Sequence, residues 1–408
     1  MKKTIIIIGG ILFILALIGI WVYLFIFGTP ESIEETIQNF PTSSGESTFV
    51  SDGLNFEDRP DPEENHSIEQ VEVNQLNISQ SALNQLTTNP VAGFSILNSE
   101  NILYVEAGTG HLFKVDISTG VQTRLSNNTF PQTRKAIFSP DNSVILFFAN
   151  NQMRIAILDT ENNLRIGQPI IAPKNVKIDV DNNILHTVSS DRSTSGFSTN
   201  TSTGETETIF TIPLKDPIIV WGETINSRHF AYPRPAAGLH GRLFEIRNNT
   251  LRFTPVAGTN LTVTRINNDF LITSRTASNT TTNIWEGGSN VSVKNFLQHP
   301  VYSEKCTKIL QLLLCAKNES SAISINDWYK GVVSFNDNLW AFDISQENAK
   351  EIINLEQASG RRIDIDMITS NSDGTKILFR NKIDGNMWLF NNLEPLTTPP
   401  LDETTEED

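Results

Sequence analysis

The residues whose spacing most directly suggests chemistry are two cysteines. Cys306 and Cys315 lie nine positions apart and are the only cysteines of the chain. If the segment between them folds as a hairpin, they lie on adjacent antiparallel strands and can form a disulfide. Two reduced, buried thiols are the alternative, because pairing requires Cα atoms within ~7 Å of each other and the sequence does not fix that distance. A zinc site is weaker than either, because no Cys-x-x-Cys or histidine pair supplies further ligands.

A short aromatic segment is the second candidate. Asp327, Trp328, Tyr329 and Lys330 follow one another in a stretch from about 317 to 336 that is longer than its counterparts elsewhere in the chain. Aromatic residues on a loop of a rigid scaffold often form a binding site. The alternative is that Trp328 and Tyr329 only fasten this longer stretch to the scaffold.

Other polar clusters predict no metal, cofactor or catalytic site. The segment from His229 to Arg242 gathers two histidines, a tyrosine and two arginines, and it is either a lining of one face of the fold or a polar loop. The acidic stretches 179–183 and 364–366 lack the glycine and the distal glutamate of a calcium loop, so we expect turn or strand-edge residues there. Gly-x-Ser-x-Gly, His-Glu-x-x-His and phosphate-loop motifs are absent from the sequence.

Charge is distributed unevenly along the 408 residues. The net charge is −15, yet residues 73–393 carry 28 acidic and 28 basic side chains. The excess of acids lies in residues 31–72, with twelve acids against Arg59 alone, and in residues 394–408, with six acids and no base. No basic surface for nucleic acid is therefore expected, and a nucleic-acid partner is excluded.

An apolar run at the N-terminus predicts a membrane anchor. Residues 5–27 contain no charge, and a helix of this length covers roughly 34 Å, slightly more than the hydrocarbon core of a bilayer. The run is longer than the apolar part of a cleavable signal peptide and lacks a small-residue cleavage site. We predict a signal-anchor transmembrane helix over 1–30, with Lys2 and Lys3 holding the N-terminus in the cytoplasm and the rest of the chain outside.

Two acidic segments flank the part of the chain that is expected to fold. Residues 31–80 are rich in Glu, Ser, Pro, Thr and Asn, and their apolar residues follow no helical or strand period. Such a segment buries too little surface to offset the entropy of ordering, so a disordered stalk is predicted there. Residues 396–408 have the same character and predict a disordered tail.

Residues 81–395 contain an internal repeat. An alternating strand recurs at seven positions, Leu112, Ile155, Gly196, Leu243, Ile284, Leu339 and Met387, with spacings of 41 to 55 residues. Spacings of this size are typical of propeller blades with four strands each. Tight polar turns precede strands that are apolar on both faces, as expected when every blade is covered by a neighbour on each side. The sequence predicts an all-β propeller with seven blades, six or eight being the alternatives.

Three motifs carry a resemblance to known repeats. The Ser139-Pro-Asp turn, the strand and turn of residues 110–120, and the stretch 86–93 with its echo at 251–258 resemble the TolB-like, WD-related β-propeller repeats. An anchor followed by an outer propeller is similar to uncharacterised bacterial surface proteins of that type. Asn200 and Arg247 depart from the pattern, since they replace the aspartate of the first unit. The resemblance implies an architecture and says little about activity, because propellers serve both as binding modules and as enzymes.

The start of the repeat region is expected to close the ring. Residues 82–88 resemble the fourth strand of other units, and no fourth strand follows Phe390, so we expect this N-terminal strand to complete the last blade.

The first hypothesis for the function is a non-enzymatic binding or assembly module outside the cell, with a protein or surface polysaccharide as partner. The alternative is an enzyme that acts on extracellular glycan, a hydrolase or lyase with carboxylates from different blades at the central channel.

Overall fold

The structure is a computed structural model that describes residues 72–73, 82–159, 164–236, 238–266, 269–275, 280–285, 293–297, 301–309, 312–318, 325–343 and 348–392. The predicted membrane span 5–27, the stalk and the acidic tail lie outside these ranges, apart from Glu72 and Val73 of the stalk. No helix among the described residues is both long enough and apolar enough to cross a membrane.

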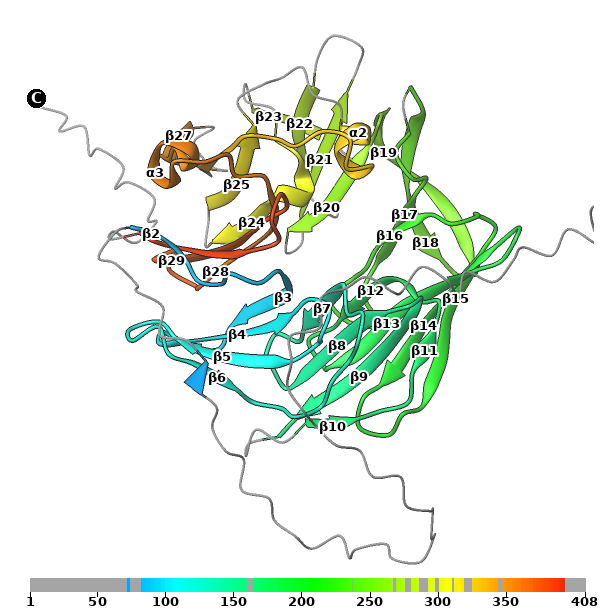
Figure 1. Ribbon diagram of the computed structural model, residues 1–408. Coiled ribbons are helices and arrows are strands. Elements are labelled where there is room, and N and C mark those ends of the chain that lie inside the picture. The colour runs from blue at the N-terminus through cyan, green and yellow to red at the C-terminus, as the bar shows by residue number, and fades with distance from the viewer. Residues whose placement is uncertain are drawn as a thin grey trace, which may run out of the picture. The chain divides into compact units, whose positions relative to one another are not determined.

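The described chain folds into seven antiparallel sheets, shown in Figure 1. From the innermost strand outward, the first sheet contains β3 (Val91–Ile96), β4 (Asn101–Glu106), β5 (Leu112–Asp116), β6 (Gln122–Arg124) and β1 (Glu72–Val73). The second contains β7 (Lys135–Phe138), β8 (Val144–Ala149), β9 (Gln152–Leu158) and β10 (Leu164–Ile166), and β11 (Ile170–Ile171) also pairs with β9. The third contains β12 (Lys174–Ile178), β13 (Asn183–Ser189), β14 (Thr194–Asn200) and β15 (Thr206–Ile212).

The other four sheets follow the same order from inside to outside. They are β16 (Ile218–Val220), β17 (His229–Tyr232), β18 (His240–Arg247) and β19 (Thr250–Thr259); β20 (Thr262–Ile266), β21 (Asp269–Arg275), β22 (Thr280–Trp285) and β23 (Val293–Leu297); β24 (Cys306–Ile309), β25 (Leu312–Asn318), β26 (Asp337–Asp343) and β27 (Asn348–Ile353); and β28 (Ile365–Ser370), β29 (Lys376–Asn381), β30 (Met387–Asn391) and β2 (Leu83–Gln85). Three short helices are also described: η1 (Ser303–Lys305), α2 (Ile325–Tyr329) and α3 (Leu355–Ser359).

The sheets stand around a common centre as the blades of a propeller. Neighbouring innermost strands contact one another from β3 through β7, β12 and β16 to β20. Helix η1 contacts both β20 and β28, β24 contacts β28, and β28 contacts β3, which completes the ring (Figure 1). All seven repeat positions identified in the sequence lie on the third strand of a blade. The predicted seven-bladed, all-β propeller is thus confirmed.

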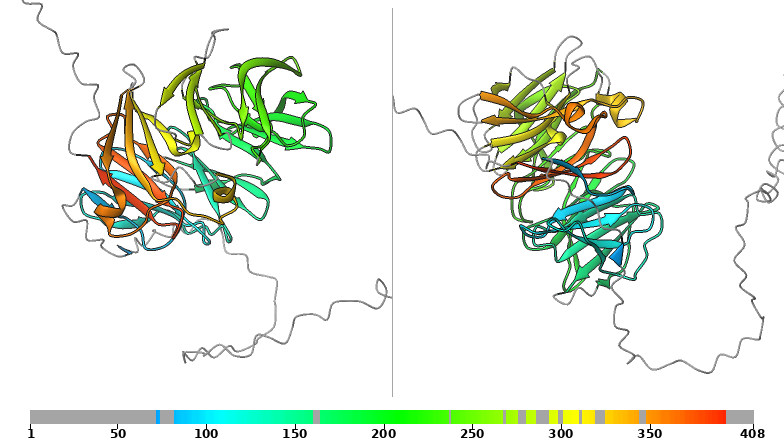
Figure 2. Two further views of the ribbon diagram at one scale, coloured as in Figure 1. Left: turned by 90° about the horizontal axis from the view of Figure 1, so that it is seen from above. Right: turned by 60° about the vertical axis from the view of Figure 1, so that its left-hand side comes forward.

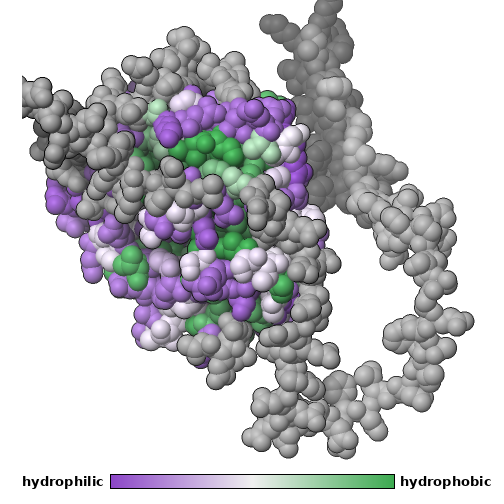
Figure 3. All heavy atoms as spheres, turned by 90° about the vertical axis from the view of Figure 1, so that its left-hand side faces the viewer, coloured by the Kyte–Doolittle hydropathy of each residue, from purple (hydrophilic) through white to green (hydrophobic). Residues whose placement is uncertain are grey.

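Apolar residues on both faces of the middle strands build the core. In β8, Val144 and Leu146 pack toward the third blade, while Ile145 and Phe147 pack toward the first. Because each blade is covered on both sides, an alternating polar face is not needed, and the strand is apolar throughout. On the face drawn in Figure 3, hydrophobic residues come to the surface only in bands and small areas between hydrophilic ones.

The N-terminal strand closes the ring as expected. Strand β2 pairs antiparallel with β30, with Leu83 opposite Phe390, and Leu86 beyond it is fully buried. Figure 2 shows this blue strand beside the red strands of the last blade. The first and last blades are therefore joined by the chain itself, and neither is left with an open edge at this point.

The polar turns that marked the repeats cap the strands with side-chain hydrogen bonds. Asp116 Oδ1 accepts from the backbone N–H groups of Ser118 and Thr119, and Gly120 follows with a φ of +70°. Asn200 replaces this aspartate and accepts from Ser202 and Thr203 in the same way. The departure seen in the sequence therefore preserves the turn, because an amide oxygen is as suitable an acceptor as a carboxylate here.

One sequence correspondence was wrong. Residues 251–258 lie within the single outer strand β19, whereas residues 86–93 run from the end of β2 through a connection into β3. The two stretches share residue types but occupy different places in the blade. Proline is tolerated in β19 because an outer strand has one unpaired side.

Candidate functional site: the mouth of the ring

The loops of the propeller are divided between its two faces. In a blade of four antiparallel strands, the loop between the second and third strands and the connections between blades lie at the same edge. We call this the loop face. It carries α2, which belongs to the loop between β25 and β26, and η1, which belongs to the connection between the fifth and sixth blades.

A hollow of about 450 Å³ opens on the loop face where the seventh, first and second blades meet. We call it the mouth hollow. Pro90, Val91 and Ala107 form apolar parts of its lining, and Gly108 and Gly385 bring backbone close to it with φ values of +83° and +75°. A Cβ on Gly385 would lie 2.7 Å from Cβ of Pro90, so glycine is needed for this close approach.

Positive charge prevails in the mouth hollow. Its charged lining residues are Arg134, Arg380, Lys382 and Asp366. Nε and Nη2 of Arg380 donate to the two carboxylate oxygens of Asp366 over 2.8 and 2.7 Å, and Nη1 donates to the carbonyl of Val91 over 2.9 Å. The one acid is therefore neutralised by one of the three bases. The Arg134 side chain is exposed and has no hydrogen-bond or ion-pair partner within the described ranges.

Beside the hollow lie three titratable groups from distant parts of the chain. Lys135 begins the inner strand of the second blade, Glu304 lies in η1, and Tyr329 ends α2. All three side chains are exposed, yet protein surrounds them on several sides. This partial desolvation lowers the pKa of Lys135, and the neighbouring charge of Arg380 lowers it further. Desolvation also raises the pKa of Glu304, against the effects of a hydrogen bond with Tyr329 and of the Lys135 ammonium.

The predicted aromatic segment divides between two roles. Trp328 is buried, and its indole N–H donates to the carboxylate of Asp364 over 2.8 Å. Tyr329 is 44 % exposed; partial desolvation raises its pKa, and it lies close enough to Glu304 for that carboxyl group to raise the pKa further. Asp327 is partly buried and Lys330 is exposed. Trp328 thus fastens the insertion to the propeller, and Tyr329 is the member of the segment that a ligand at the mouth would reach.

The other sequence candidates lie elsewhere. Cys306 and Cys315 face each other on β24 and β25 and are joined by a disulfide, with Cα atoms 4.1 Å apart. His229 is buried at the start of β17, and Arg234, after the end of that strand, binds Asp216 over 3.0 Å. His240 lies exposed on β18. The segment from His229 to Arg242 therefore includes a polar loop and does not form one site.

The acidic stretches also differ in role. Asp179 accepts from the N–H groups of Asp181 and Asn183 and shapes a turn, as expected. Asp364 lies directly before β28, at a strand edge as expected, and is in addition fully buried and ion-paired with Lys305. Within the described part of the chain, no three His, Cys, Asp or Glu side chains come close enough to hold a metal ion.

The charged residues of the mouth are not recognisable as a group in the sequence, because they come from different blades. Arg134 and Lys135 are separated from Arg380 by about 245 positions, and only ring closure brings them together. What these residues share is their position in a blade. Each is a charged residue at or just before the start of an inner strand, or at the end of a second strand. That signal becomes readable once the blade boundaries are known.

Comparisons with known proteins give the same class of fold. No protein-family model and no curated protein matches the sequence. Among solved structures, the chain is similar to an oligogalacturonate lyase from Vibrio parahaemolyticus, with 10% identity, a TM-score of 0.50, and coverage of 76% of this chain and 93% of that one. An oligogalacturonate lyase in complex with manganese gives 11% identity, a TM-score of 0.51, and the same coverage of 76% and 93%.

A third solved structure is the Cps50 (Swd1) β-propeller domain of Myceliophteria thermophila. Its identity is 9%, its TM-score is 0.51, and the match covers 76% of this chain and 99% of that domain. At these identities the likeness concerns the fold alone. The protein is a seven-bladed β-propeller with a cationic hollow on its loop face.

Proposed function

We propose that this propeller is a non-enzymatic binding module, displayed outside the cell on a single-pass N-terminal anchor, and that it binds an anionic ligand at the mouth hollow. The observation that carries the proposal is the excess of cations in that hollow, with Arg134 unpaired among the described residues. A ligand carboxylate would gain a bidentate, charge-assisted partner there without breaking an existing ion pair. Membership of the TolB-like propellers is part of the same proposal and rests on the sequence motifs.

The location outside the cytoplasm has two supports. The first is the charge asymmetry around the apolar run 5–27, with Lys2 and Lys3 on one side and acids on the other. The second is the disulfide between Cys306 and Cys315, because disulfides persist in oxidising compartments. Protease added to intact cells should therefore release a folded fragment that begins near residue 80. Protection in intact cells together with digestion after lysis would contradict this location.

Binding at the mouth is tested with charged polymers. Acidic oligosaccharides and oligoglutamate should bind the full chain, and neutral oligosaccharides should not. Binding should weaken as salt is raised, since exposed charges are screened. Arg134→Gln should weaken binding about tenfold, which corresponds to the loss of one charge-assisted hydrogen-bonded pair. Arg165→Gln is the matched control, because Arg165 is exposed on the outer strand β10. Equal binding of neutral and acidic polymers would contradict the proposal.

A second candidate function is an enzyme that acts on extracellular glycan at the channel. It is favoured by one observation: Glu304 and Lys135, which are far apart in the sequence, lie close enough to influence each other's pKa, and Tyr329 lies beside Glu304. Groups with shifted pKa values are suited to proton transfer. The test is cleavage of acidic polysaccharides, followed as new chain ends. If the chain is this enzyme, Glu304→Gln should abolish cleavage while binding persists; no cleavage by the unaltered chain would exclude the function for those substrates.

A further inference from the structure

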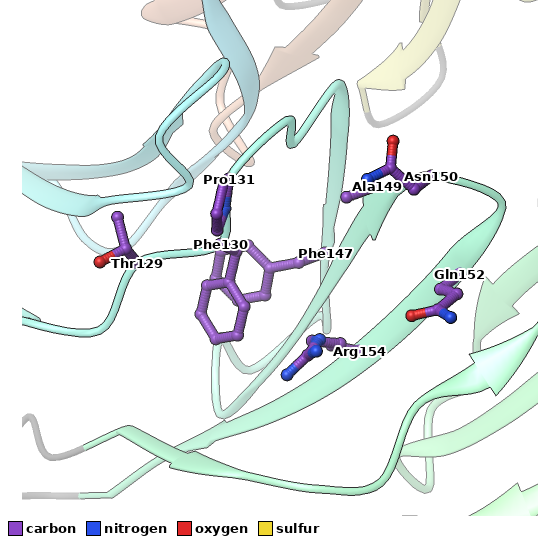
Figure 4. A pocket seen from close by; sticks show the side chains of 8 residues that line it. All are labelled: Thr129, Phe130, Pro131, Phe147, Ala149, Asn150, Gln152 and Arg154. Carbon is purple, nitrogen blue, oxygen red and sulfur yellow. The ribbon is translucent and has the colours of Figure 1, made fainter. Parts of the chain in front are cut away.

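A second hollow lies on the side of the second blade that faces the first blade, and we call it the side pocket. Its volume is about 220 Å³. Figure 4 shows its lining, which comes from the β6–β7 connection and from the β8–β9 hairpin. Strand β8 pairs with β9 so that Phe147 is opposite Arg154 and Ala149 is opposite Gln152. Paired residues share a face of the sheet, so these four side chains are directed toward the same hollow.

The inner wall of the side pocket is aromatic and closed. The rings of Phe130 and Phe147 stack with centroids 4.4 Å apart, and the two residues are 4 % and 1 % exposed. They belong to the core between the first and second blades. The two rings therefore close the floor of the pocket, and a ligand there would contact mainly its polar rim.

The rim of the side pocket is polar. Thr129, Asn150, Gln152 and Arg154 are all exposed, and Arg154 has no hydrogen-bond or ion-pair partner within the described ranges. Figure 4 shows Arg154 next to the two phenyl rings. A guanidinium binds a carboxylate with two parallel hydrogen bonds. The side-chain amides of Asn150 and Gln152 each have N–H donors and an acceptor oxygen. They therefore match adjacent hydroxyl groups of a ligand, which also donate and accept.

The segment 129–134 separates the side pocket from the mouth hollow. Its first three residues line the side pocket, and its last three line the mouth hollow. Backbone hydrogen bonds fix it to the loop of the first blade, from Phe130 N–H to the Thr109 carbonyl over 2.8 Å and from Gln132 N–H to the Gly108 carbonyl over 2.7 Å. The segment is therefore a firm ridge between two hollows, each of which has one unpaired arginine.

We propose that the side pocket binds one hexuronate unit of an acidic polysaccharide, and that the polymer crosses the ridge into the mouth hollow. This inference rests on the proposed function and names the ligand class. The carboxylate of the unit binds Arg154, and its hydroxyl groups bind Asn150, Gln152 and Thr129. Arg134 binds a carboxylate further along the polymer. Arg154 is two strands away from the start of β7, so the Cα atoms of the two arginines are on the order of 10 Å apart, a separation that an extended polymer spans.

An acidic peptide fits this surface less well. A bound peptide usually pairs its backbone with free N–H and C=O groups, yet the ridge offers few donors. Pro131 has no N–H, Gln132 donates to Gly108, and Arg134 donates its backbone N–H to the carbonyl of Phe148 over 2.9 Å. Hydroxyl-rich ligands instead match the amide and hydroxyl groups of the rim.

Titration calorimetry on the full chain tests the inference with galacturonate and mannuronate oligomers of increasing length. Neutral oligomers of the same lengths and oligoglutamate serve as comparisons. Affinity for uronates should rise with length once both hollows are reached. Arg154→Gln should remove that gain and weaken binding of the long oligomers about tenfold, or about 1.4 kcal/mol. Arg165→Gln lies in the same sheet and should change nothing; melting temperatures confirm that both variants fold.

The outcomes separate the inference from the proposed function. If Arg134→Gln weakens binding and Arg154→Gln does not, the ligand stays in the mouth hollow and the side pocket is not a subsite. Tighter binding of oligoglutamate than of any uronate would overturn the ligand class while leaving an anionic ligand at the mouth. If no acidic polymer binds, the proposed function fails together with the inference.

Discussion

The ammonium group of Lys305 lies 2.6 Å from Oδ2 of Asp337, and the two side chains are 1 % and 0 % exposed. The same ammonium lies 2.9 Å from Oδ1 of Asp364 and over the rings of Trp328 and Phe335, 4.7 and 4.3 Å from their centroids. Asp337 also accepts from the backbone N–H of Ile365 at the start of the last blade. This network joins η1, the insertion and the seventh blade, so it supports the elements that carry Glu304 and Tyr329.

Replacing Lys305 with Met should destabilise the propeller strongly. The substitution keeps the volume of the side chain but leaves two buried carboxylates without their cation, and breaking a buried ion pair in this way costs about 3–5 kcal/mol. Denaturant unfolding measures the change. Lys330→Met, in the same insertion but exposed, should have an effect of less than about 1 kcal/mol. Similar stability of the two variants would show that the network does not support the fold.

Truncation tests the closure of the ring. Removing residues 1–80 takes away only the two-residue strand β1 and retains β2, so it should leave the melting temperature nearly unchanged. Removing residues 1–89 takes away β2 with the buried Leu83 and Leu86, and exposes the edge of β30. We expect a large loss of stability or aggregation, since an unpaired edge is a template for association. Equal melting of the two truncated chains would show that β2 contributes nothing to the last blade.

His229 should make stability depend on pH. Its Nδ1 accepts from the N–H of Gly222 over 2.9 Å, so Nε2 carries the proton and donates to the carbonyl of Ile225 over 3.0 Å. Burial lowers the pKa of His229 from its ordinary value of 6.5. A lowered pKa means that the folded state takes up the proton less readily than the unfolded chain. The stability that neutral His229 gives to the folded state is thus fully present above about pH 6.5, and it is lost as the pH falls through the folded-state pKa.

The matching experiment follows the melting temperature between neutral and mildly acidic pH. His229→Asn keeps an acceptor for the Gly222 N–H but cannot be protonated, so the decrease at acidic pH should become smaller. His240→Asn, at an exposed position, should leave the slope unchanged. An unchanged slope in His229→Asn would assign the pH dependence to other groups, such as His111 and His186, whose pKa values burial also lowers.

The disulfide can be tested independently of any ligand. Thiol counting on denatured, unreduced protein from outside the cell should find no free thiol. Reduction should destabilise the sixth blade, by about 2–4 kcal/mol if it behaves as a typical disulfide. Replacing both cysteines with alanine is the control, because that variant should be insensitive to reductant. Two reactive thiols in the unreduced protein would return Cys306 and Cys315 to the alternative of reduced, buried side chains.

The sequence alone determined the architecture. Residues such as Val144 to Phe148 are apolar without alternation, and the turns around Asp116 and Asn200 recur at blade intervals. Both signals are local, since a covered strand and a tight turn each depend on a few adjacent residues. The same patterns identified the strand at Leu83 as the missing fourth strand of the last blade. The likeness of residues 86–93 to residues 251–258 misled because similar short stretches can occupy different places in a blade.

Only the tertiary structure decided which side chains meet at the mouth. Lys135, Glu304 and Arg380 come from two blades and a connection between blades, and no local pattern states which of these segments meet in the ring. The ambiguity over Trp328 and Tyr329 was resolved in the same way, because Trp328 is buried against Lys305 and Asp364, which lie 23 positions before it and 36 positions after it. Local sequence sets the conformation of each blade, while contacts between blades are fixed by closure of the whole ring.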